Sequence, residues 1–296
     1  MKVPGITLSN GHILRYIIAS GGLEYDGKGW VWDYPLRWLG LLDERLFTTV
    51  MKTVTLSPRK GNFLWWNPLR CIRYIPEGTV NAFGLTNPGI HQIHQTIKPK
   101  IDRRRSAVIG SILGEPAEKV EMARILNDCD FVALEDNASC PNTNDDTLYN
   151  REKVIRGFEA TRKASRFPII GKLSVAHDIE WIMARAEGLI EAIDINSVPW
   201  SMAFPDDQSS LAHLGGGGVS GKAAQPHTWK LVKDLVGMTD IPIIGPSVWQ
   251  YGDIDQLIEM GVKAVSFGSL LMPHPFCPLN PLRPTAFVKK HLAENA

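Results

Sequence analysis

The sequence predicts a (β/α)8 TIM barrel, and three observations favour this fold class. Short apolar runs alternate with longer amphipathic segments along most of the chain. Eight such runs are present, and several are continuously apolar, which is typical of parallel strands buried on both faces. The length of 296 residues is common for one barrel of this kind. We therefore expect a single domain that spans residues 1–296.

The strands and helices of the predicted barrel follow from the pattern of apolar residues. The predicted strands cover residues 14–19, 48–56, 107–112, 130–134, 168–173, 192–198, 241–245 and 264–267. The predicted helices have apolar residues at i, i+3 and i+4 spacing and cover residues 115–127, 151–165, 177–187, 225–236 and 252–260. Because a barrel places its chemistry on the loops after its strands, the candidate functional residues lie just beyond each run.

One segment breaks the alternation. Residues 56–86 are rich in turn residues and show no helical period. We interpret this segment as a β-hairpin excursion that lies over the top of the barrel.

The charge and cysteine composition argues against several protein classes. With 32 Lys+Arg against 31 Asp+Glu and 44% hydrophobic residues, the chain fits neither a disordered protein nor a basic nucleic-acid binder. Its four scattered cysteines lack CxxC spacing, which suits a reducing cytosol rather than a self-contained iron–sulfur cluster. Arg15 interrupts the apolar run 13–19, so we expect no signal peptide. The expectation is a cytoplasmic protein with no nucleic-acid or membrane partner.

The glycine run at residues 214–222 matches two nucleotide-binding motifs incompletely. Its G-x-G-x-x-G triplet does not follow a predicted strand, and its G-x-x-x-x-G-K stretch is followed by Ala223 where a P-loop has Ser or Thr. We prefer an interpretation in which backbone N–H groups approach a phosphate ahead of a helix that begins at Gln225. The alternatives are a flexible loop and a non-catalytic nucleotide-binding protein.

A cysteine lies among carboxamides just after a predicted strand. The segment 136–143 reads DNASCPNT and places Cys140 between Asn137 and Asn142, whose amides can hold a planar, multiply hydrogen-bonded ligand. A cysteine at the mouth of a barrel can act as a base or a nucleophile when its pKa is suitable. The alternative is a structural cysteine in a polar turn.

Two lysines lie in apolar strand contexts, Lys52 in TVMKTVTL and Lys172 in PIIGKLSV. A buried ammonium without a partner is costly, so lysines at the ends of two strands indicate a shared anionic ligand. Asn196 and Ser197 add an amide and a hydroxyl at another strand end. The alternative is that each lysine extends its amine to solvent.

The histidines and tryptophans indicate no further site. His91 and His94 are three residues apart, but they follow Pro88 and Gly89, which favours the start of a surface helix over a metal site. No metal is expected. The nine tryptophans are scattered and are interpreted as core or lid packing.

Together these segments resemble the dihydroorotate dehydrogenase family, whose members are flavin-dependent enzymes on a (β/α)8 barrel. The matches run in the family's order from near residue 13 to residue 272. They read ASGG at 19–22, KTVTLSPRKGN at 52–62, NAFGLTNPG at 81–89, NASCPN at 137–142, GKLS at 171–174, INSV at 195–198, GGVSG at 217–221 and FGS at 267–269. NxSCPN with KTVT and NxxGLxNPG is a specific combination, whereas each motif alone would be weak.

The resemblance implies oxidation of (S)-dihydroorotate to orotate in pyrimidine biosynthesis, with FMN as cofactor. Cys140 would be the general base that removes a proton from C5, while C6 gives a hydride to flavin N5. A cysteine base, rather than a serine, indicates the soluble class 1 branch. An alternative is an FMN barrel that oxidises another dihydropyrimidine or a related small substrate.

The resemblance also implies which residues surround each ligand. Those at the substrate are Lys52, Asn81, Gly84, Leu85, Asn137, Asn142, Asn196 and Ser197. Those at FMN are Ala19, Ser20, Lys52, Asn137, Lys172, Ile195, Gly221, Gly245, Ser247, Gly268 and Ser269. Lys172 would lie near the N1/O2 edge of the flavin, where a positive charge stabilises the anionic reduced ring.

One segment departs from the family pattern. After the seventh strand the family usually has a Gly-Gly pair at the flavin phosphate, whereas this chain has Gly245, Pro246, Ser247 and Val248. Pro246 has no N–H to donate, and Val248 is bulky where glycine would allow close approach. The departure predicts a weaker hold on the phosphate, which the hydroxyl of Ser247 could offset.

The resemblance leaves the electron acceptor open. Fumarate, a quinone, and NAD reached through an iron–sulfur flavoprotein partner are all compatible with it. A homodimer is the family expectation.

Overall fold

The computed structural model describes residues 1–64, 66–138, 150–272 and 281–295 of the chain. Within these residues, eight parallel strands form one sheet in the order β10-β9-β8-β7-β4-β3-β14-β13. Their bounds are β3 Tyr16–Ile18, β4 Thr48–Val50, β7 Ala107–Ile112, β8 Ala133–Asn137, β9 Ile169–Leu173, β10 Ala192–Ile195, β13 Ile244–Gly245 and β14 Ala264–Phe267.

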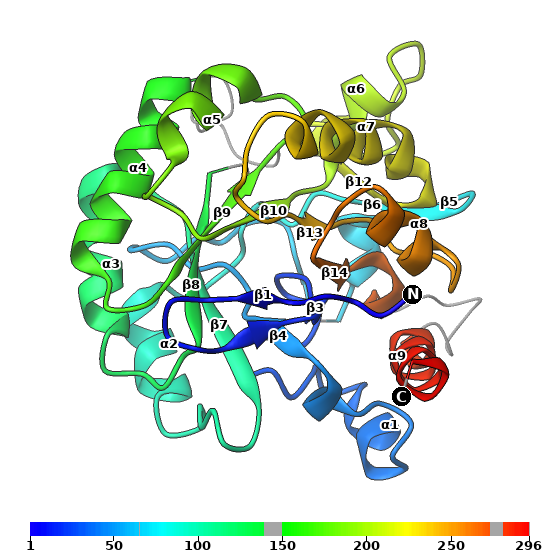
Figure 1. Cartoon of the computed structure of the whole chain (residues 1–296), viewed down its shortest axis with the longest axis horizontal. Helices are drawn as coiled ribbons and strands as arrows, with labels where there is room; N and C mark the ends of the chain where they lie inside the picture. Colours follow the sequence, from blue (N-terminus) through cyan, green and yellow to red (C-terminus); the bar gives the residue numbers. More distant parts are fainter. Residues whose placement is uncertain (65, 139–149, 273–280, 296) are drawn as a thin grey trace.

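The two end strands of this sheet meet and close it into a barrel. Ile193 of β10 forms a parallel bridge with Ile243, just before β13. The Ile193 N–H also donates a hydrogen bond to the Pro242 carbonyl at 3.0 Å. The predicted (β/α)8 barrel is therefore confirmed, and helices surround it in Figure 1.

Several strand boundaries were predicted wrongly, and β3, β10 and β13 are each three residues shorter than expected. The predicted strand 48–56 ends as β4 at Val50, although Val54 pairs again with Ile112 as an isolated bridge. The predicted strand 130–134 lies three residues further along as β8, because the buried Glu135 and Asp136 continue the strand. Two acidic residues are unusual inside a strand that is buried on both faces, and apolarity alone therefore placed its end too early.

The five predicted helices are confirmed at closely similar bounds, as α3 Pro116–Leu126, α4 Arg151–Ala164, α5 Ile179–Ala186, α7 Gln225–Val236 and α8 Asp253–Glu259. Helix α3 starts with Pro116 and a capping box in which Glu115 and Glu118 each bind the other's backbone N–H. Of four further helices among the described residues, only α2 was expected, as the start of a surface helix at His91 and His94. The four are α1 Tyr34–Trp38, α2 Ile90–Ile97, α6 Trp200–Ala203 and α9 Leu282–Glu294.

The barrel has an apolar lower end. An N-terminal hairpin of β1 Ile6–Thr7 and β2 Ile13–Leu14 packs beneath the strands. Its side chains Ile6 and Leu14 join a buried cluster with inward residues such as Val50. The charged and polar residues of the interior therefore lie toward the carboxyl ends of the strands, where barrel enzymes place their active sites.

A second, antiparallel sheet lies beyond the carboxyl ends of the barrel strands. It consists of β5 Ile72–Ile75, β6 Gly78–Asn81, β12 Gly218–Gly221 and β11 Val198–Pro199, in the order β11-β12-β6-β5. Strands β5 and β6 form the hairpin expected in residues 56–86, so that expectation is confirmed.

The glycine run contains a strand that was not predicted, while its expected contact with a phosphate stays a prediction. Residues Gly218–Gly221 form strand β12, which pairs with β6, so their backbone takes part in a sheet ladder. The preceding Gly217 has φ +89°, and a Cβ there would lie 2.8 Å from the carbonyl oxygen of Asn81. This run is glycine-rich because the chain turns and approaches β6 closely.

Among the described residues, no helix combines the length and apolarity that crossing a membrane requires.

A buried ion pair joins the helical layer to the barrel. Lys119 of α3 and Asp136 of β8 are 1% and 0% exposed, and their charged atoms lie 2.6 Å apart. Thr161 of α4 donates to the other carboxylate oxygen at 2.5 Å. Gly157 of α4 makes room for the pair, because a Cβ there would lie 2.5 Å from Lys119 Nζ.

Replacing Lys119 by Met should destabilise the fold strongly. The substitution leaves the Asp136 carboxylate buried without its counter-charge, which typically costs about 3–5 kcal/mol. Urea unfolding followed by circular dichroism would measure the change. The matched control is Lys230→Met, because Lys230 pairs with Asp234 on the exposed face of α7. That variant should lose less than about 1 kcal/mol, and equal losses in the two variants would contradict this account of the pair.

Candidate functional site

A pocket opens between the carboxyl ends of the barrel strands and the second sheet. Most of the site residues expected from the sequence come together in its wall. These are Ala19, Ser20, Lys52, Asn81, Leu85, Asn137, Lys172, Ile195, Asn196, Ser197, Gly221, Ser247, Gly268 and Ser269.

Four of the expected residues are not among those that line the pocket. Gly84 packs against Asn62, and Gly245 lies buried in β13, where a Cβ would contact Leu257 and Val262. Cys140 and Asn142 lie outside the described residues. The assigned roles of these four residues therefore stay predictions.

An aromatic wall on the hairpin side of the pocket was not predicted as part of the site. Trp30 stacks on Trp32 with ring centroids 5.3 Å apart, and Phe63 lies 5.6 Å from Trp30 and 5.0 Å from Phe83. All four rings line the pocket. The sequence signal was the local density of aromatics at 30–34 and 63–66, which was interpreted as packing.

Lys52 presents its amine at the pocket from the loop after β4. Its ammonium donates a hydrogen bond to the Thr86 carbonyl and lies 5.6 Å from the centre of the Tyr25 ring. These contacts fix the ammonium at the pocket wall, where it can meet an anionic ligand. The alternative of a lysine that extends its amine to solvent leaves out two contacts, because the ammonium donates to the Thr86 carbonyl and the side chain lines the pocket.

Lys172 lies at the pocket floor between two buried carboxyl groups. Its Nζ is 3.0 Å from Asp194 on β10 and 3.4 Å from Glu135 on β8. Burial alone would lower the pKa of Lys172, but the charges of Asp194 and Glu135 outweigh it and raise the pKa above its ordinary value. The anionic partners of this lysine therefore include residues of the chain itself. Their sequence signal was an acidic residue inside each of two apolar strands, VALED and AIDI.

Neutral polar groups complete the floor beside Lys172. Asn137 donates to Thr53 at 3.2 Å, and the Thr53 hydroxyl lies 3.0 Å from that of Ser20. All three residues line the pocket. Thr53 is a site residue that the sequence reasoning did not single out, although it lies within the KTVT motif. The floor combines one cation with uncharged donors and acceptors whose positions are fixed by one another.

The segment after β13, where the sequence departs from the family pattern, does not obstruct the pocket. Ser247 adopts φ +63°, a left-handed conformation that usually favours glycine, and its hydroxyl lies 3.2 Å from that of Thr228 in α7. Val248 was expected to obstruct a ligand, but its side chain is 1% exposed and packs in the barrel core instead. Pro246 and Ser247 line the pocket. The side of the pocket next to the first turn of α7 is therefore not closed by Val248.

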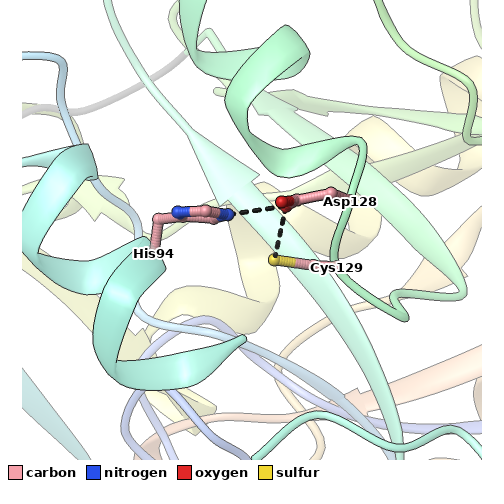
Figure 2. A group of neighbouring side chains, drawn as sticks. All are labelled: His94, Asp128 and Cys129. Atoms are coloured by element: carbon pink, nitrogen blue, oxygen red, sulfur yellow. Dashed lines mark hydrogen bonds and ion pairs between the residues drawn. The ribbon is translucent and has the colours of Figure 1, made fainter. Parts of the chain in front are cut away.

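One group of side chains elsewhere has the composition of a metal site, and Figure 2 shows it. His94 of α2 lies 2.6 Å from Asp128, and the Cys129 thiol lies 3.9 Å from the same carboxylate oxygen. The other oxygen of Asp128 pairs with the Lys98 ammonium at 2.5 Å. Burial raises the pKa of Cys129 to about 12, so its thiol is protonated at neutral pH. The group is therefore a hydrogen-bonded ion pair. The positive charge of Lys98 would repel a metal ion at the same carboxylate. His94 does lie on a helix, as expected.

Comparison with known proteins identifies relatives over most of the chain. The family model described as dihydroorotate dehydrogenase matches residues 37–271. A curated relative from Desulforudis audaxviator, named dihydroorotate dehydrogenase B (NAD(+)), catalytic subunit, is 32% identical over 93% of this chain and 87% of its own length. A relative of the same name from Oceanobacillus iheyensis is 28% identical over 93% of this chain and 88% of its own length.

A solved structure supports the fold independently of close sequence similarity. The tryptophan synthase α-subunit of Pyrococcus furiosus superposes with a TM-score of 0.51 and 12% identity, covering 98% of each chain. At that identity the likeness extends to the fold alone. The family model and the curated relatives go further and confirm the resemblance found in the sequence motifs. The chain belongs to the dihydroorotate dehydrogenase family, in its class 1 branch of oxidoreductases that act on CH–CH donors.

Proposed function

We propose that this protein oxidises (S)-dihydroorotate to orotate in pyrimidine biosynthesis, with FMN bound in the pocket. The observation that supports this most is the composition of the pocket wall. Two lysines, Lys52 and Lys172, lie among amides and hydroxyls from several barrel strands and the second sheet. These are the residue types that bind a small anionic heterocycle beside a flavin ring.

The pocket fits a flavin on chemical grounds. The isoalloxazine ring is neutral when oxidised and gains negative charge on reduction, so it needs uncharged hydrogen-bonding groups together with one fixed cation. Asn137 and Ser20 supply the former, and Lys172 supplies the latter. Gly221 and Gly268 expose backbone at the wall, and Ser247 beside the first turn of α7 offers a hydroxyl for the phosphate.

Other groups of the pocket wall would bind the substrate. The Lys52 ammonium, held near Thr86 and Tyr25, would pair with the carboxylate of dihydroorotate. Asn81 and Asn196 would hydrogen-bond the amide edges of the ring. When bound, FMN accepts the hydride that leaves C6.

Cys140 would remove the proton from C5 of the substrate. It follows Asn137, the last residue of β8 and part of the pocket wall, by three positions in the chain. A free thiol has a pKa of about 8.5, so modest stabilisation of the thiolate makes it an effective base near neutral pH.

Electrons then leave through a partner. The relatives are named as catalytic subunits of an NAD(+)-dependent enzyme, which implies an additional subunit for them. We propose that this chain likewise passes electrons to an iron–sulfur flavoprotein partner and that it forms a homodimer. Fumarate and a quinone are the alternative acceptors.

A second candidate substrate is another dihydropyrimidine, such as dihydrouracil or dihydrothymine. The aromatic wall formed by Trp30, Trp32, Phe63 and Phe83 favours considering it, because such a wall accepts a planar ring whether or not that ring carries a carboxylate. The half-buried Lys52 ammonium favours dihydroorotate.

Replacing Cys140 by Ala should slow flavin reduction by dihydroorotate about 10²–10⁴-fold, the usual contribution of a positioned base. Flavin should stay bound, and the wild-type rate should rise with pH as the thiol ionises. Anaerobic stopped-flow absorbance would measure both. The matched control is Cys129→Ala, which removes a buried thiol outside the pocket and should leave the rate unchanged. An unchanged rate in Cys140→Ala would remove the assigned base.

Replacing Lys52 by Met should change substrate preference. Loss of a charge-assisted hydrogen bond worth about 1.5–3 kcal/mol should lower kcat/KM for dihydroorotate about 10–100-fold, with little effect on dihydrouracil. Steady-state kinetics with both substrates would test this. Lys222→Met is the control, because Lys222 pairs with Glu77 and does not line the pocket. A higher kcat/KM of the wild type for dihydrouracil than for dihydroorotate would favour the second candidate.

A further inference from the structure

Beneath the pocket, six successive elements around the barrel each contribute one polar side chain to a continuous layer. In order around the barrel, this polar layer consists of Ser20, Thr53, Ser111, Glu135, Lys172 and Asp194. Three of its members, Ser20, Thr53 and Lys172, also line the pocket. The layer therefore connects the pocket wall with the barrel interior.

Every neighbouring pair in the polar layer is in contact. The hydroxyls of Ser20 and Thr53 lie 3.0 Å apart, and those of Thr53 and Ser111 lie 2.8 Å apart. Ser111 donates to Glu135 Oε1 at 2.7 Å. Lys172 bridges the remaining oxygen of Glu135 to Asp194. Glu135 is thus fully buried yet linked to the pocket both by hydroxyls and by an ammonium.

The charges of the layer do not balance when both acids are ionised. One ammonium faces two carboxylates, and all three side chains are at most 5% exposed. A net charge of −1 in a buried site is costly, and one bound proton removes it. Asp194 Oδ1 is buried without a hydrogen-bond partner among the described residues, and the Lys172 ammonium holds both carboxyl groups, at 3.4 Å from Glu135 and 3.0 Å from Asp194. The two acids can therefore share that proton.

The surroundings add no other charge to this pair among the described residues. Strand β7 presents the neutral Ser111, β9 presents Lys172, and β10 presents Asp194 itself. The next residue along β8, Asp136, points to the opposite face and is closed in its own pair with Lys119.

We propose that Glu135 and Asp194 form a proton-holding carboxyl pair that sets the charge beneath Lys172. The pair takes up one proton from solvent when negative charge enters the pocket and returns it when that charge leaves. The inference rests on the proposed function, because flavin reduction is what brings the charge. No substrate bond forms or breaks at the pair, so Glu135 and Asp194 are positioning residues.

The acidity of Glu135 suits this role. Burial raises the pKa of Glu135 to about 7, while the positive charge of Lys172 opposes that rise. A carboxyl group with such a pKa changes charge near neutral pH in response to a modest change in the local field. The two acids interact, so the proton belongs to the pair rather than to either residue alone.

Infrared titration of the protein without added ligand tests the pair directly. Difference spectra recorded from about pH 5 to about pH 9 should show a protonated carboxylic acid that ionises near neutral pH. Glu135→Gln and Asp194→Asn should each abolish this transition. Burial also raises the pKa of Asp33 to about 6, so Asp33→Asn is the assignment control and should leave the transition in place. A transition that persists in both Glu135→Gln and Asp194→Asn would overturn the proposal.

A milder variant guards against failure of the acid variants to fold. Ser111→Ala removes the hydrogen bond to the ionised form of Glu135, so the transition should move upward by about one pH unit. An unmoved transition would contradict the assignment to Glu135.

The FMN-loaded protein then tests the coupling to the pocket. In the wild-type protein, a plot of the flavin midpoint potential against pH should show a change of slope near neutral pH in addition to any change that the flavin itself causes. This additional change of slope should be absent in Glu135→Gln. An identical pH dependence in the two proteins would overturn the coupling. If the protein binds no FMN, the proposed function fails, whereas the infrared titration still decides whether the carboxyl pair holds a proton.

Discussion

The closure of eight parallel strands into a barrel is the constraint on which the rest of this structure depends. Inward side chains of neighbouring strands must meet in layers, because each strand alternates its faces and the sheet has no open edge. The lower layers are apolar and are capped by the β1–β2 hairpin. At the carboxyl ends the inward positions carry charges, and buried charges are stable only when paired. Lys172 is therefore held between Glu135 and Asp194.

This pairing gives the pocket its chemical character. Because Lys172 is already paired with carboxyl groups, it does not attract an anion with its full positive charge. The net charge beneath the pocket depends on how many protons Glu135 and Asp194 hold. Lys52 lies elsewhere in the pocket, where its ammonium is beside the Thr86 carbonyl and the Tyr25 ring. The pocket consequently has one cation at its floor that is paired with two carboxyl groups, and a second cation at its wall.

The sequence predicted the parts of the molecule that local patterns determine. Helix α7 was placed correctly because its apolar period and neighbouring turn residues are local, and Lys52, Asn137 and Lys172 were found because polar residues stood at the ends of apolar runs. The aromatic wall and the partners of Lys172 depend on contacts between segments far apart in the chain. The strand within the glycine run was not predicted for the same reason, because β12 exists only through its pairing with β6.

The most direct test of the account is the visible absorption spectrum of the purified protein under anaerobic conditions, before and after addition of L-dihydroorotate. We expect a flavin band that bleaches on addition, because the pocket would hold FMN and substrate together. A flavin band that persists would contradict the assigned substrate and favour another dihydropyrimidine. A protein that stays colourless after FMN is supplied would contradict the account as a whole, and the segment from Pro246 to Val248 would be the first place to seek the cause.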